Sequence, residues 1–246
     1  MLDYIRLNEL LFLDIETVPA FPSFEAMPET LHELWAVKHS YLQKDTDETP
    51  QSGYLRRAGV YAEFAKIICI SIGYFHYDAN GHRTLRIKSF YGDDEYTLLK
   101  SFTDLLFQKF NVPGAYRFCG HNIREFDVPF ICRRLIINML PLPQMLDKSG
   151  QRPWDNPDVD TLQLWKFGDY KHYTSLKLLA AIMNIPTPKD EIEGKDVCRV
   201  YWQEKNLNRI VSYCQKDVVT VARLLLRFKG DTTTLADEDV VIVANP

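Results

Sequence analysis

The sequence predicts an α/β fold in which a central mixed β-sheet is flanked by α-helices. A short apolar run near the N-terminus indicates a buried strand, a hairpin of two strands follows it, and the second half is mostly helical in pattern. Strands that alternate with helices, with one antiparallel hairpin among them, are typical of a mixed sheet covered by helices. The 246 residues, 46% of them hydrophobic, are enough for one large domain with a substantial core.

The first predicted strand is the run ELLFLDI at 9–15, which we expect to be buried because it is short and almost entirely apolar. The pattern then changes, because the polar stretch 45–49 and four prolines, Pro19, Pro22, Pro28 and Pro50, interrupt it. One helix is predicted within this part of the chain, at 31–41. We therefore expect residues from about 18 to 64 to form an insertion after the first strand.

The following segments predict a hairpin and then alternate between helix and strand. β-Branched residues at 66–74 predict a strand, and Asn80-Gly81 predicts a tight turn into a second strand at 84–91. Apolar residues at helical spacing follow at 93–110, and a short strand is predicted at 116–119. The remaining predicted elements are a helix at 125–140, a short strand at 159–161, a helix at 175–183 and a long helix at 206–228.

The last residues, 231–246, form a tail that is acidic and then apolar. Such a tail is either a disordered end or a strand that docks on the fold, and the sequence leaves both alternatives open. The apolar runs of the chain are too short to span a bilayer, and its N-terminus carries acids where a signal peptide would be basic. We expect a soluble, cytoplasmic protein with no membrane partner.

The net charge of −4 argues against a protein that coats nucleic acid by electrostatic attraction. It does not exclude an enzyme that acts on nucleic acid, because metal ions held in a carboxylate pocket can carry the positive charge that faces the phosphate. The five cysteines have no CxxC spacing and lie mostly among apolar residues, which predicts reduced thiols in the core.

Two carboxylates follow the first apolar run and are the first candidates for chemistry. As positions i and i+2 of a strand, Asp14 and Glu16 point to the same face. We expect both at the C-terminal end of the strand, where open α/β sheets place their sites. Taken alone, the pair is also typical of two solvated acids at a strand end.

Two more acids lie in helical segments. Tyr213 and Asp217 are four residues apart in the long predicted helix and share one face, and the apolar surroundings of Asp217 require a metal or a basic partner. Asp127 lies close to a helix start, where an acid is also favourable for the helix dipole. A group of buried carboxylates is tolerated when a divalent cation neutralises it, so the sequence predicts metal-assisted phosphoryl chemistry.

Three motifs, DIET at 14–17, GHNIREFDVPF at 120–130 and YCQKD at 213–217, together resemble the DEDDy subclass of the DnaQ-like 3′–5′ exonucleases. The resemblance extends over most of the chain. The stretch 173–217 is similar to the proofreading domain of family-B DNA polymerases, and the chain looks like a stand-alone relative of that domain. This resemblance implies an RNase H-like fold, with a single exonuclease domain at 1–230 and the tail at 231–246.

The resemblance also implies a metal site and a substrate. The four acids Asp14, Glu16, Asp127 and Asp217 would hold two divalent ions, Mg²⁺ or Mn²⁺. Tyr213 would orient the attacking water; with an ordinary tyrosine pKa of about 10 it is a poor general base, so lowering the pKa of the water falls to the metal. The implied substrate is the 3′ end of a single-stranded nucleic acid, which the enzyme would shorten by releasing nucleoside 5′-monophosphates.

Three further residues are candidate substrate contacts. Thr17 is placed to reach the terminal nucleotide, Asn122 to bond a base or sugar, and Phe126 to offer a face for stacking. Asp160, in the run PDVDT, is interpreted as a supporting or helix-capping acid and not as a metal ligand.

Three alternatives accompany this hypothesis. DNA is preferred over RNA as the substrate because the stretch 173–217 resembles polymerase proofreading domains, and an exoribonuclease of the same fold is the first alternative. A nucleic-acid-binding module without catalytic activity is the second, and the presence of all four acids and the tyrosine argues against it. A structural Ca²⁺-binding domain is the third, but acids drawn from both strands and helices differ from an EF-hand loop.

Overall fold

The computed structural model describes residues 2–42, 47–112, 114–169, 173–186, 192–231 and 235–244. Residues 43–46 of the predicted insertion, and residues 232–234 and 245–246 of the predicted tail, therefore lie outside the described residues. None of the helices in the described ranges combines the length and the apolar character that crossing a lipid bilayer requires.

A six-stranded sheet forms the centre of the described part of the molecule. Its strands are β1 (Leu10–Pro19), β2 (Ala65–Tyr77), β3 (Arg83–Tyr91), β4 (Arg117–Gly120), β5 (Val159–Asp160) and β6 (Val240–Ile242). They lie in the order β5-β4-β1-β2-β3-β6. Strand β2 is antiparallel to both of its neighbours, β1 and β3, whereas β4 pairs in parallel with β1, β5 with β4, and β6 with β3. The prediction of a mixed sheet is confirmed.

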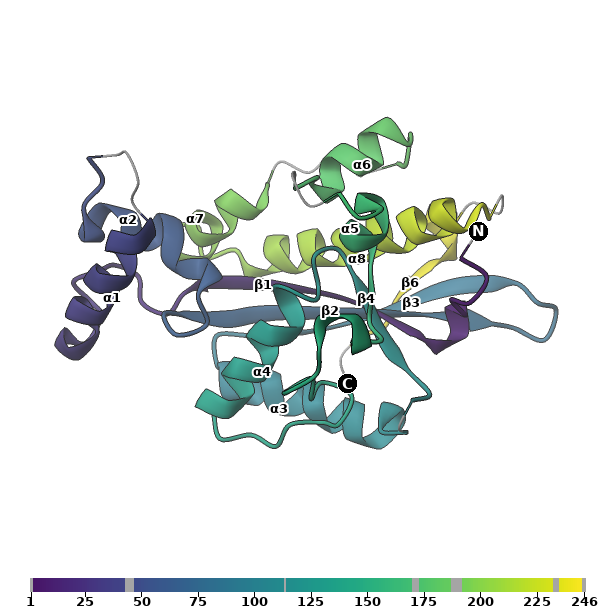
Figure 1. Ribbon diagram of the computed structural model, residues 1–246, viewed down its shortest axis with the longest axis horizontal. Helices are drawn as coiled ribbons and strands as arrows, with labels where there is room; N and C mark the ends of the chain where they lie inside the picture. The colour runs from purple at the N-terminus through teal and green to yellow at the C-terminus, as the bar shows by residue number, and fades with distance from the viewer. Residues whose placement is uncertain are drawn as a thin grey trace.

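Helices cover both faces of this sheet (Figure 1). On one face lie α3 (Glu95–Leu105), which continues into the π-helical turn η3 (Leu106–Phe110), and α4 (Asp127–Ile137). On the other face lie α5 (Thr161–Lys166), α6 (Leu176–Ile182), α7 (Val197–Trp202) and α8 (Leu207–Lys229). Short 3₁₀ turns complete the described elements: η1 (Leu7–Glu9), η2 (Ala58–Val60), η4 (Pro153–Asp155), η5 (Gly194–Asp196) and η6 (Asp237–Asp239).

Strand β1 is buried on both faces, which explains its nearly continuous apolar sequence. Leu11, Leu13 and Ile15 pack with the α3–α4 layer, and Leu10 and Phe12 pack with α8. The strand is longer than the sequence predicts, because pairing with β2 continues to Pro19 across a register shift between Glu16 and Thr17. The expectation that Asp14 and Glu16 lie at the C-terminal end of the strand is therefore wrong, since they lie in its middle.

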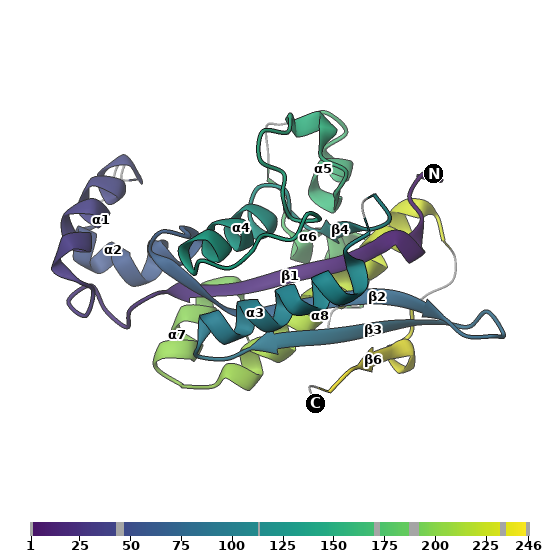
Figure 2. The same cartoon turned by 90° about the horizontal axis from the view of Figure 1, so that it is seen from below.

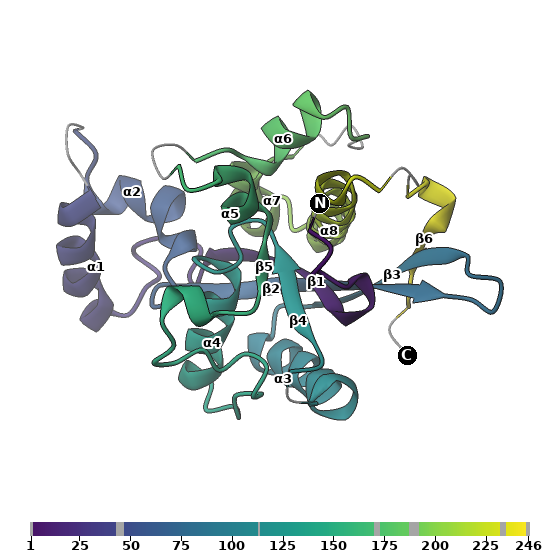
Figure 3. The same ribbon diagram turned by 45° about the vertical axis from the view of Figure 1, so that its right-hand side comes forward.

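Helix α8 is the longest helix described and runs close to the sheet (Figure 3). The side chain of Asn206 caps its start by accepting the Arg209 N–H at 3.2 Å, and Gly230, with φ of 71°, ends it in the left-handed conformation. A Cβ atom at Gly73 of β2 would lie 2.8 Å from Cγ1 of Val218. The missing side chain at this crossing lets the helix approach the strand closely.

Residues between β1 and β2 form a small helical lobe at the end of the sheet opposite the β2–β3 turn (Figure 1). It contains α1 (Glu29–Leu42) and α2 (Pro50–Arg57). Their core consists of Met27, Trp35, Tyr54, Ala58 and Phe64. The sequence predicts α1 but not α2, because a proline at position 50 is expected to interrupt regular secondary structure. In the structure Pro50 occupies the first turn of α2, where its missing N–H costs nothing, and Thr49 caps the helix.

The tail forms a strand. Val240 and Ile242 of β6 pair in parallel with Leu85 and Ile87 of β3, so that the sheet gains an outer strand (Figure 2). Arg223 of α8 holds the approach to this strand by donating hydrogen bonds to the Leu235 carbonyl at 3.0 Å and to the Asp237 carboxylate at 2.6 Å. Of the two alternatives that the sequence leaves open, the structure has the docked strand.

Candidate active site

The candidate site lies where β4 stops pairing with β1. The two strands pair only from Leu10 to Phe12 of β1, so from Leu13 onward this edge of β1 has no strand partner among the described residues. The Ile15 N–H, which a longer β4 would have bonded, donates instead to Oδ1 of Asp127 at 3.1 Å. The early end of β4 therefore brings a carboxylate from the start of α4 to the strand that carries Asp14 and Glu16.

The connection from β4 to α4 is a tight turn with little freedom. At Gly120 a Cβ atom would lie 2.9 Å from the Leu13 carbonyl oxygen, so no larger residue fits without moving backbone. Asn122 has φ of 64°, the left-handed conformation that asparagine adopts more readily than most residues. Asp160 accepts the N–H groups of Asn122 at 3.0 Å and of Leu162 at 2.9 Å, and so ties the turn to the start of α5. This confirms the interpretation of Asp160 as a helix-capping acid.

All four predicted acids and Tyr213 meet at this edge. Asp14 and Glu16 come from β1, Asp127 from the start of α4, and Tyr213 and Asp217 from one face of α8. Burial raises the pKa of Asp14 well above its usual value, and the next strongest influences are the charges of Asp217, Glu16 and Asp127. Each carboxylate is thus close enough to the others to disfavour their ionisation.

The other acids show the same electrostatics. Burial raises the pKa of Glu16, with Asp217 the next contributor. Burial also raises the pKa of Asp127 to about 7, although hydrogen bonds from its own backbone and from Ile15 act in the opposite direction. Residues Glu16 and Asp127 are only 8% and 4% exposed, so water does little to screen this repulsion. A cluster of this kind attracts a cation.

One atom in the cluster points to the same conclusion. Oδ2 of Asp14 is buried and has no hydrogen-bond partner among the described residues. Leaving a buried carboxylate oxygen without a partner is costly, and metal coordination is one way to satisfy it. Carboxylate oxygens are the donors that Mg²⁺ and Mn²⁺ prefer. The donor set therefore fits divalent ions of this kind.

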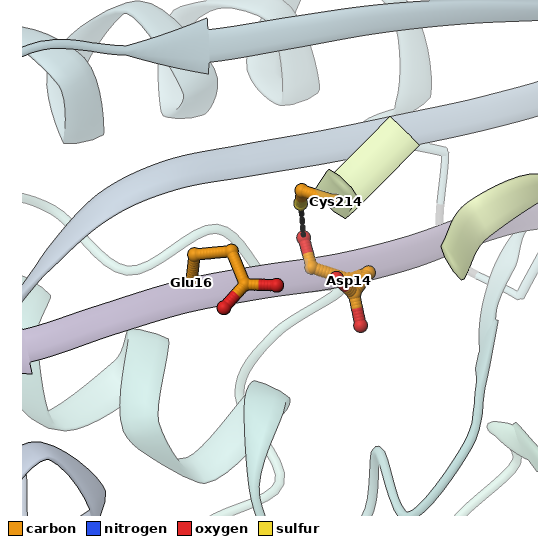
Figure 4. A group of neighbouring side chains, drawn as sticks. All are labelled: Asp14, Glu16 and Cys214. Carbon is orange, nitrogen blue, oxygen red and sulfur yellow. Dashed lines mark hydrogen bonds between the residues drawn. The ribbon is translucent and has the colours of Figure 1, made fainter. Parts of the chain in front are cut away.

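A cysteine lies against the acids, which the sequence does not predict. Sγ of Cys214 donates to the backbone carbonyl of Asp14 at 3.4 Å, and ligand atoms of Asp14, Glu16 and Cys214 lie within 4.8 Å of one another (Figure 4). Burial raises the pKa of the Cys214 thiol well above its usual value. Its hydrogen bond to the Asp14 carbonyl fixes α8 on β1, and Mg²⁺ prefers oxygen ligands to sulfur.

Asp14 and Asp217 line a cavity of about 430 Å³, and part of its lining is not predicted from the sequence. Tyr213 also lines it, as do Tyr173 and Lys177 from the segment around the start of α6. Burial raises the pKa of Tyr173, followed by the charges of Asp127, Asp160 and Asp217, so its hydroxyl lies near enough to these acids to be affected by their charge. The sequence predicts Thr174 or Ser175 as the residue that caps α6, and in the structure it is Ser175. Nothing in the sequence indicates that Tyr173, two residues earlier, lines the cavity.

His121 supports this wall. Its Nε2 bonds the Thr174 carbonyl at 2.9 Å and its Nδ1 lies 3.0 Å from the Thr161 hydroxyl. Its ring packs edge-on against Tyr173, with 6.2 Å between the centroids. Burial lowers the pKa of His121, so the ring is neutral at pH 7. Because both ring nitrogens are engaged, we assign His121 a structural role.

The three predicted substrate contacts have different surroundings in the structure. The Thr17 hydroxyl donates to the Gly59 carbonyl at 2.6 Å, which fixes η2 against β1. The side-chain oxygen of Asn122 is buried without a hydrogen-bond partner among the described residues. Phe126 packs against Phe130, with 5.4 Å between the ring centroids, and is partly buried. Their contacts with a nucleotide stay predictions.

Comparison with known proteins identifies the family. Residues 60–244 match the family described as "Predicted 3'-5' exonuclease related to the exonuclease domain of PolB". The chain belongs to this family. Its membership confirms the resemblance to a relative of the family-B proofreading domain, and it makes the protein a predicted nuclease, a hydrolase of nucleic acid. Among curated proteins, none matches the sequence.

A solved structure shows the same fold. The family B DNA polymerase from the hyperthermophilic archaeon Pyrobaculum calidifontis is similar with a TM-score of 0.54 and 15% sequence identity. The similarity covers 89% of this exonuclease-family chain but 24% of the polymerase, so the chain spans about a quarter of that protein's length. At this identity the likeness concerns the fold, and the predicted RNase H-like α/β arrangement is confirmed.

Proposed function

We propose that this protein is a metal-dependent 3′–5′ exonuclease of the DEDDy subclass, which removes nucleoside 5′-monophosphates from the 3′ ends of single-stranded DNA. The observation that carries the proposal is the meeting of four carboxylates from three segments around Asp14, whose Oδ2 atom is buried without a partner. Membership in a family of predicted 3′–5′ exonucleases supports the direction of cleavage.

The proposed metal ligands are Asp14, Glu16, Asp127 and Asp217. Two divalent ions, Mg²⁺ or Mn²⁺, would lower the pKa of the attacking water and offset the charge that develops on the departing 3′ oxygen when bound. The protein's own contribution is to hold these oxygens in place: β1 fixes two of them on one face, and the Ile15 N–H orients Asp127.

We assign Tyr213 the role of positioning the water rather than of removing its proton. Burial raises the pKa of Tyr213 above its usual value, followed by the charges of Asp217, Glu16 and Asp14. A phenol that keeps its proton at pH 7 can donate a hydrogen bond, and Tyr213 donates to Asp217 on the same helix face. The hydroxyl is thereby held beside the acids, where its oxygen is suited to accept a hydrogen bond from a water molecule.

The remaining parts of the site suit a terminal nucleotide. The side-chain oxygen of Asn122 has no hydrogen-bond partner among the described residues, so a base or sugar that reaches it would supply one. We keep Thr17 and Phe126 as proposed substrate contacts, and Tyr173 adds an aromatic side chain to the cavity lining. Stacking on aromatic rings is the usual way in which proteins hold unpaired bases.

DNA is the preferred substrate in this proposal, because the family is related to the exonuclease domain of a DNA polymerase. RNA is the alternative substrate for the same chemistry. We also propose the cytoplasm as the compartment, since all five cysteines are free thiols, as a reducing environment keeps them.

The test is a degradation assay with single-stranded DNA and RNA, each labelled at the 5′ end or at the 3′ end. We expect a ladder of shortened 5′-labelled DNA and an immediate release of labelled mononucleotide from the 3′ label, in Mg²⁺ or Mn²⁺ and not in EDTA. Faster loss of RNA would assign the ribonuclease alternative. Binding without metal-dependent products on any of the substrates would leave a nucleic-acid-binding module and overturn the proposal.

A further inference from the structure

A second cavity, away from the acids, has the opposite charge. It has a volume of about 350 Å³ and is lined by Lys66, Asp93, Tyr201, Trp202, Lys205 and Leu207. We call it the dilysine cavity. It lies between the end of α7 and the sheet, at the end from which the chain passes to the helical lobe (Figure 2). None of its lining residues lines the acid cavity.

Aromatic rings hold both lysines at this cavity. Nζ of Lys66 lies 5.1 Å from the ring centroid of Tyr201 and 5.4 Å from that of Trp202. Nζ of Lys205 lies 4.9 Å from the ring centroid of Trp202. An ammonium over an aromatic face gains cation–π attraction, so both charges are directed to one indole.

The two lysines are near acids but, among the described residues, are not paired with them. Lys66 donates to the backbone carbonyl of Asp93 at 3.2 Å, while the Asp93 carboxylate accepts the Tyr201 hydroxyl at 2.7 Å. Within the described ranges, neither lysine forms an ion pair with a carboxylate. Burial lowers the pKa of Lys66; Asp93 and Glu95 oppose this shift and Lys205 adds to it.

The walls of the cavity are fixed before any ligand arrives. The Trp202 indole N–H donates to the Pro19 carbonyl at 3.1 Å, which anchors the ring to the end of β1. Lys205 has φ of 53°, a left-handed conformation that a lysine rarely adopts and that costs free energy unless the surrounding structure imposes it. Two ammonium groups that aromatic rings hold at one cavity are suited to receive an anion.

We propose that the dilysine cavity binds a phosphate group, supplied by a nucleic-acid backbone or by a free nucleotide. Lysine is a compact point charge with three donors and suits the tetrahedral oxygens of phosphate, whereas flat carboxylates are matched better by arginine. Pro19, which anchors Trp202, follows Glu16 by three residues, about 10 Å along β1, so one oligonucleotide of a few residues spans both places. Because the proposal needs only the anion, it stands apart from the proposed nuclease activity.

The test uses the full chain in EDTA, titrated with inorganic phosphate, with thymidine 5′-monophosphate and with a fluorescent oligothymidylate. Lys66→Gln and Lys205→Gln remove one charge each, and Lys38→Gln is the matched control because Lys38 lies over the Tyr61 ring, 4.5 Å from its centroid, in the helical lobe. The indole resonance of Trp202, assigned with Trp202→Phe, reports binding at the cavity, and thermal melting checks that each variant is folded.

We expect phosphate to shift the Trp202 resonance in the wild type and in Lys38→Gln, and to bind at least about tenfold more weakly to either cavity variant. If the cavity binds backbone phosphates, a plot of log affinity for the oligonucleotide against log salt concentration has a negative slope. The magnitude of this slope should fall by about 0.7 for each lysine removed. A loss confined to phosphate and the mononucleotide would assign the cavity to free nucleotide. Equal affinity of all variants for all three probes would overturn the proposal, whether or not the protein cleaves DNA.

Discussion

Enclosed acids occur in two regions of this protein, and their pKa values move in opposite directions. In the helical lobe, burial alone would raise the pKa of Glu48, but hydrogen bonds from Arg57, Arg56 and His39 lower it to about 2. Arg56 and Arg57 donate to its two carboxylate oxygens at 2.7 and 2.5 Å. At the edge of β1, burial and neighbouring acids raise the pKa of Asp127 to about 7.

The opposite pKa shifts distinguish an acid that stabilises the fold from acids that lack a neutralising partner and are suited to bind a cation. Glu48 is neutralised by residues of its own lobe, and it fastens α1 to α2 through His39, whose Nε2 lies 3.2 Å from the carboxylate. The acids around Asp14 repel one another, and the strongest charged influences on Asp14 are three further carboxylates. A bound cation or protonation of the acids relieves that repulsion, so the two regions respond differently to charge removal, metal and pH.

The largest expected effect is that of Asp14→Asn. We expect it to reduce hydrolysis by about 1000-fold or more, because a metal ligand is lost, and to raise the melting temperature in EDTA, because one of the repelling charges is gone. Asp104→Asn is a matched control, since Asp104 is a solvent-exposed acid paired with Lys100 at 2.6 Å. Cleavage by Asp14→Asn at the wild-type rate would remove Asp14 from the site.

A smaller loss is expected for Tyr213→Phe. If the hydroxyl only orients water, its removal slows cleavage by about 10- to 100-fold and leaves the stabilisation by Mn²⁺ unchanged. Single-turnover rates and melting curves with and without Mn²⁺ measure the two effects, with the exposed Tyr96→Phe as control. Unchanged rates would make Tyr213 a packing residue, and loss of the Mn²⁺ effect would make it part of the metal site.

Stability should depend on pH and metal together at the acid cluster. The folded-state pKa of Asp127, about 7, lies above its ordinary value of 3.8, so protonation favours the folded protein. In EDTA this contribution is complete below about pH 4 and is lost as the pH rises to 7. At pH 8, Mn²⁺ at 100 times its Kd should restore about 2.7 kcal/mol, or about 5–11 °C in Tm.

Calorimetry from pH 5 to pH 8, with EDTA or Mn²⁺, measures this linkage, and Asp127→Asn should flatten the EDTA curve. A wild-type melting temperature that rises with pH in EDTA over this range would contradict the cluster electrostatics, because it would mean that the acids are stabilised as carboxylates by groups of the protein.

The smallest effect on function is expected for Glu48→Gln. The charge that binds Arg56 and Arg57 is lost, so the melting temperature should fall equally in EDTA and in Mn²⁺, while hydrolysis is unchanged. The change in melting temperature in EDTA is therefore expected to be negative for Glu48→Gln and positive for Asp14→Asn. This pair of variants tests the difference between the two regions most directly. A rise in melting temperature for Glu48→Gln would show that both regions hold repelling acids.

Sequence patterns predict the elements that bring the acids together better than they predict the site's walls. The apolar run of β1 and the i, i+4 pair in α8 are local, so periodicity shows which side chains share a face. The sequence predicts the short strand that becomes β4, but the convergence of Asp127 also depends on how β4 pairs with β1, which no local pattern encodes. The prediction that Asp14 lies at the end of its strand is wrong because the length of β1 also depends on tertiary structure. Pairing with β2 continues to Pro19 across a register shift.

The short elements lie beyond what local patterns predict. α5 and α7 have six residues each, less than two turns, and form because their apolar faces pack against the long helix and the sheet. Tyr173 lies at the acid cavity because His121 contacts its ring and bonds the carbonyl of the next residue, Thr174. His121 and Tyr173 are 52 residues apart in the sequence. Such contacts follow from tertiary structure, so a single sequence gives no signal for them.

The unpaired edge of β1 has a consequence for solubility. An exposed strand edge is a template on which another chain can add a strand, and proteins often block such edges with a charge that points inward. Asp127 does this here, because its carboxylate occupies the N–H of Ile15 that an incoming strand would need. Because Ile15 and Asp127 are both buried, the start of α4 covers this edge, and the residue proposed to bind metal also satisfies a strand N–H that would otherwise be open to intermolecular pairing.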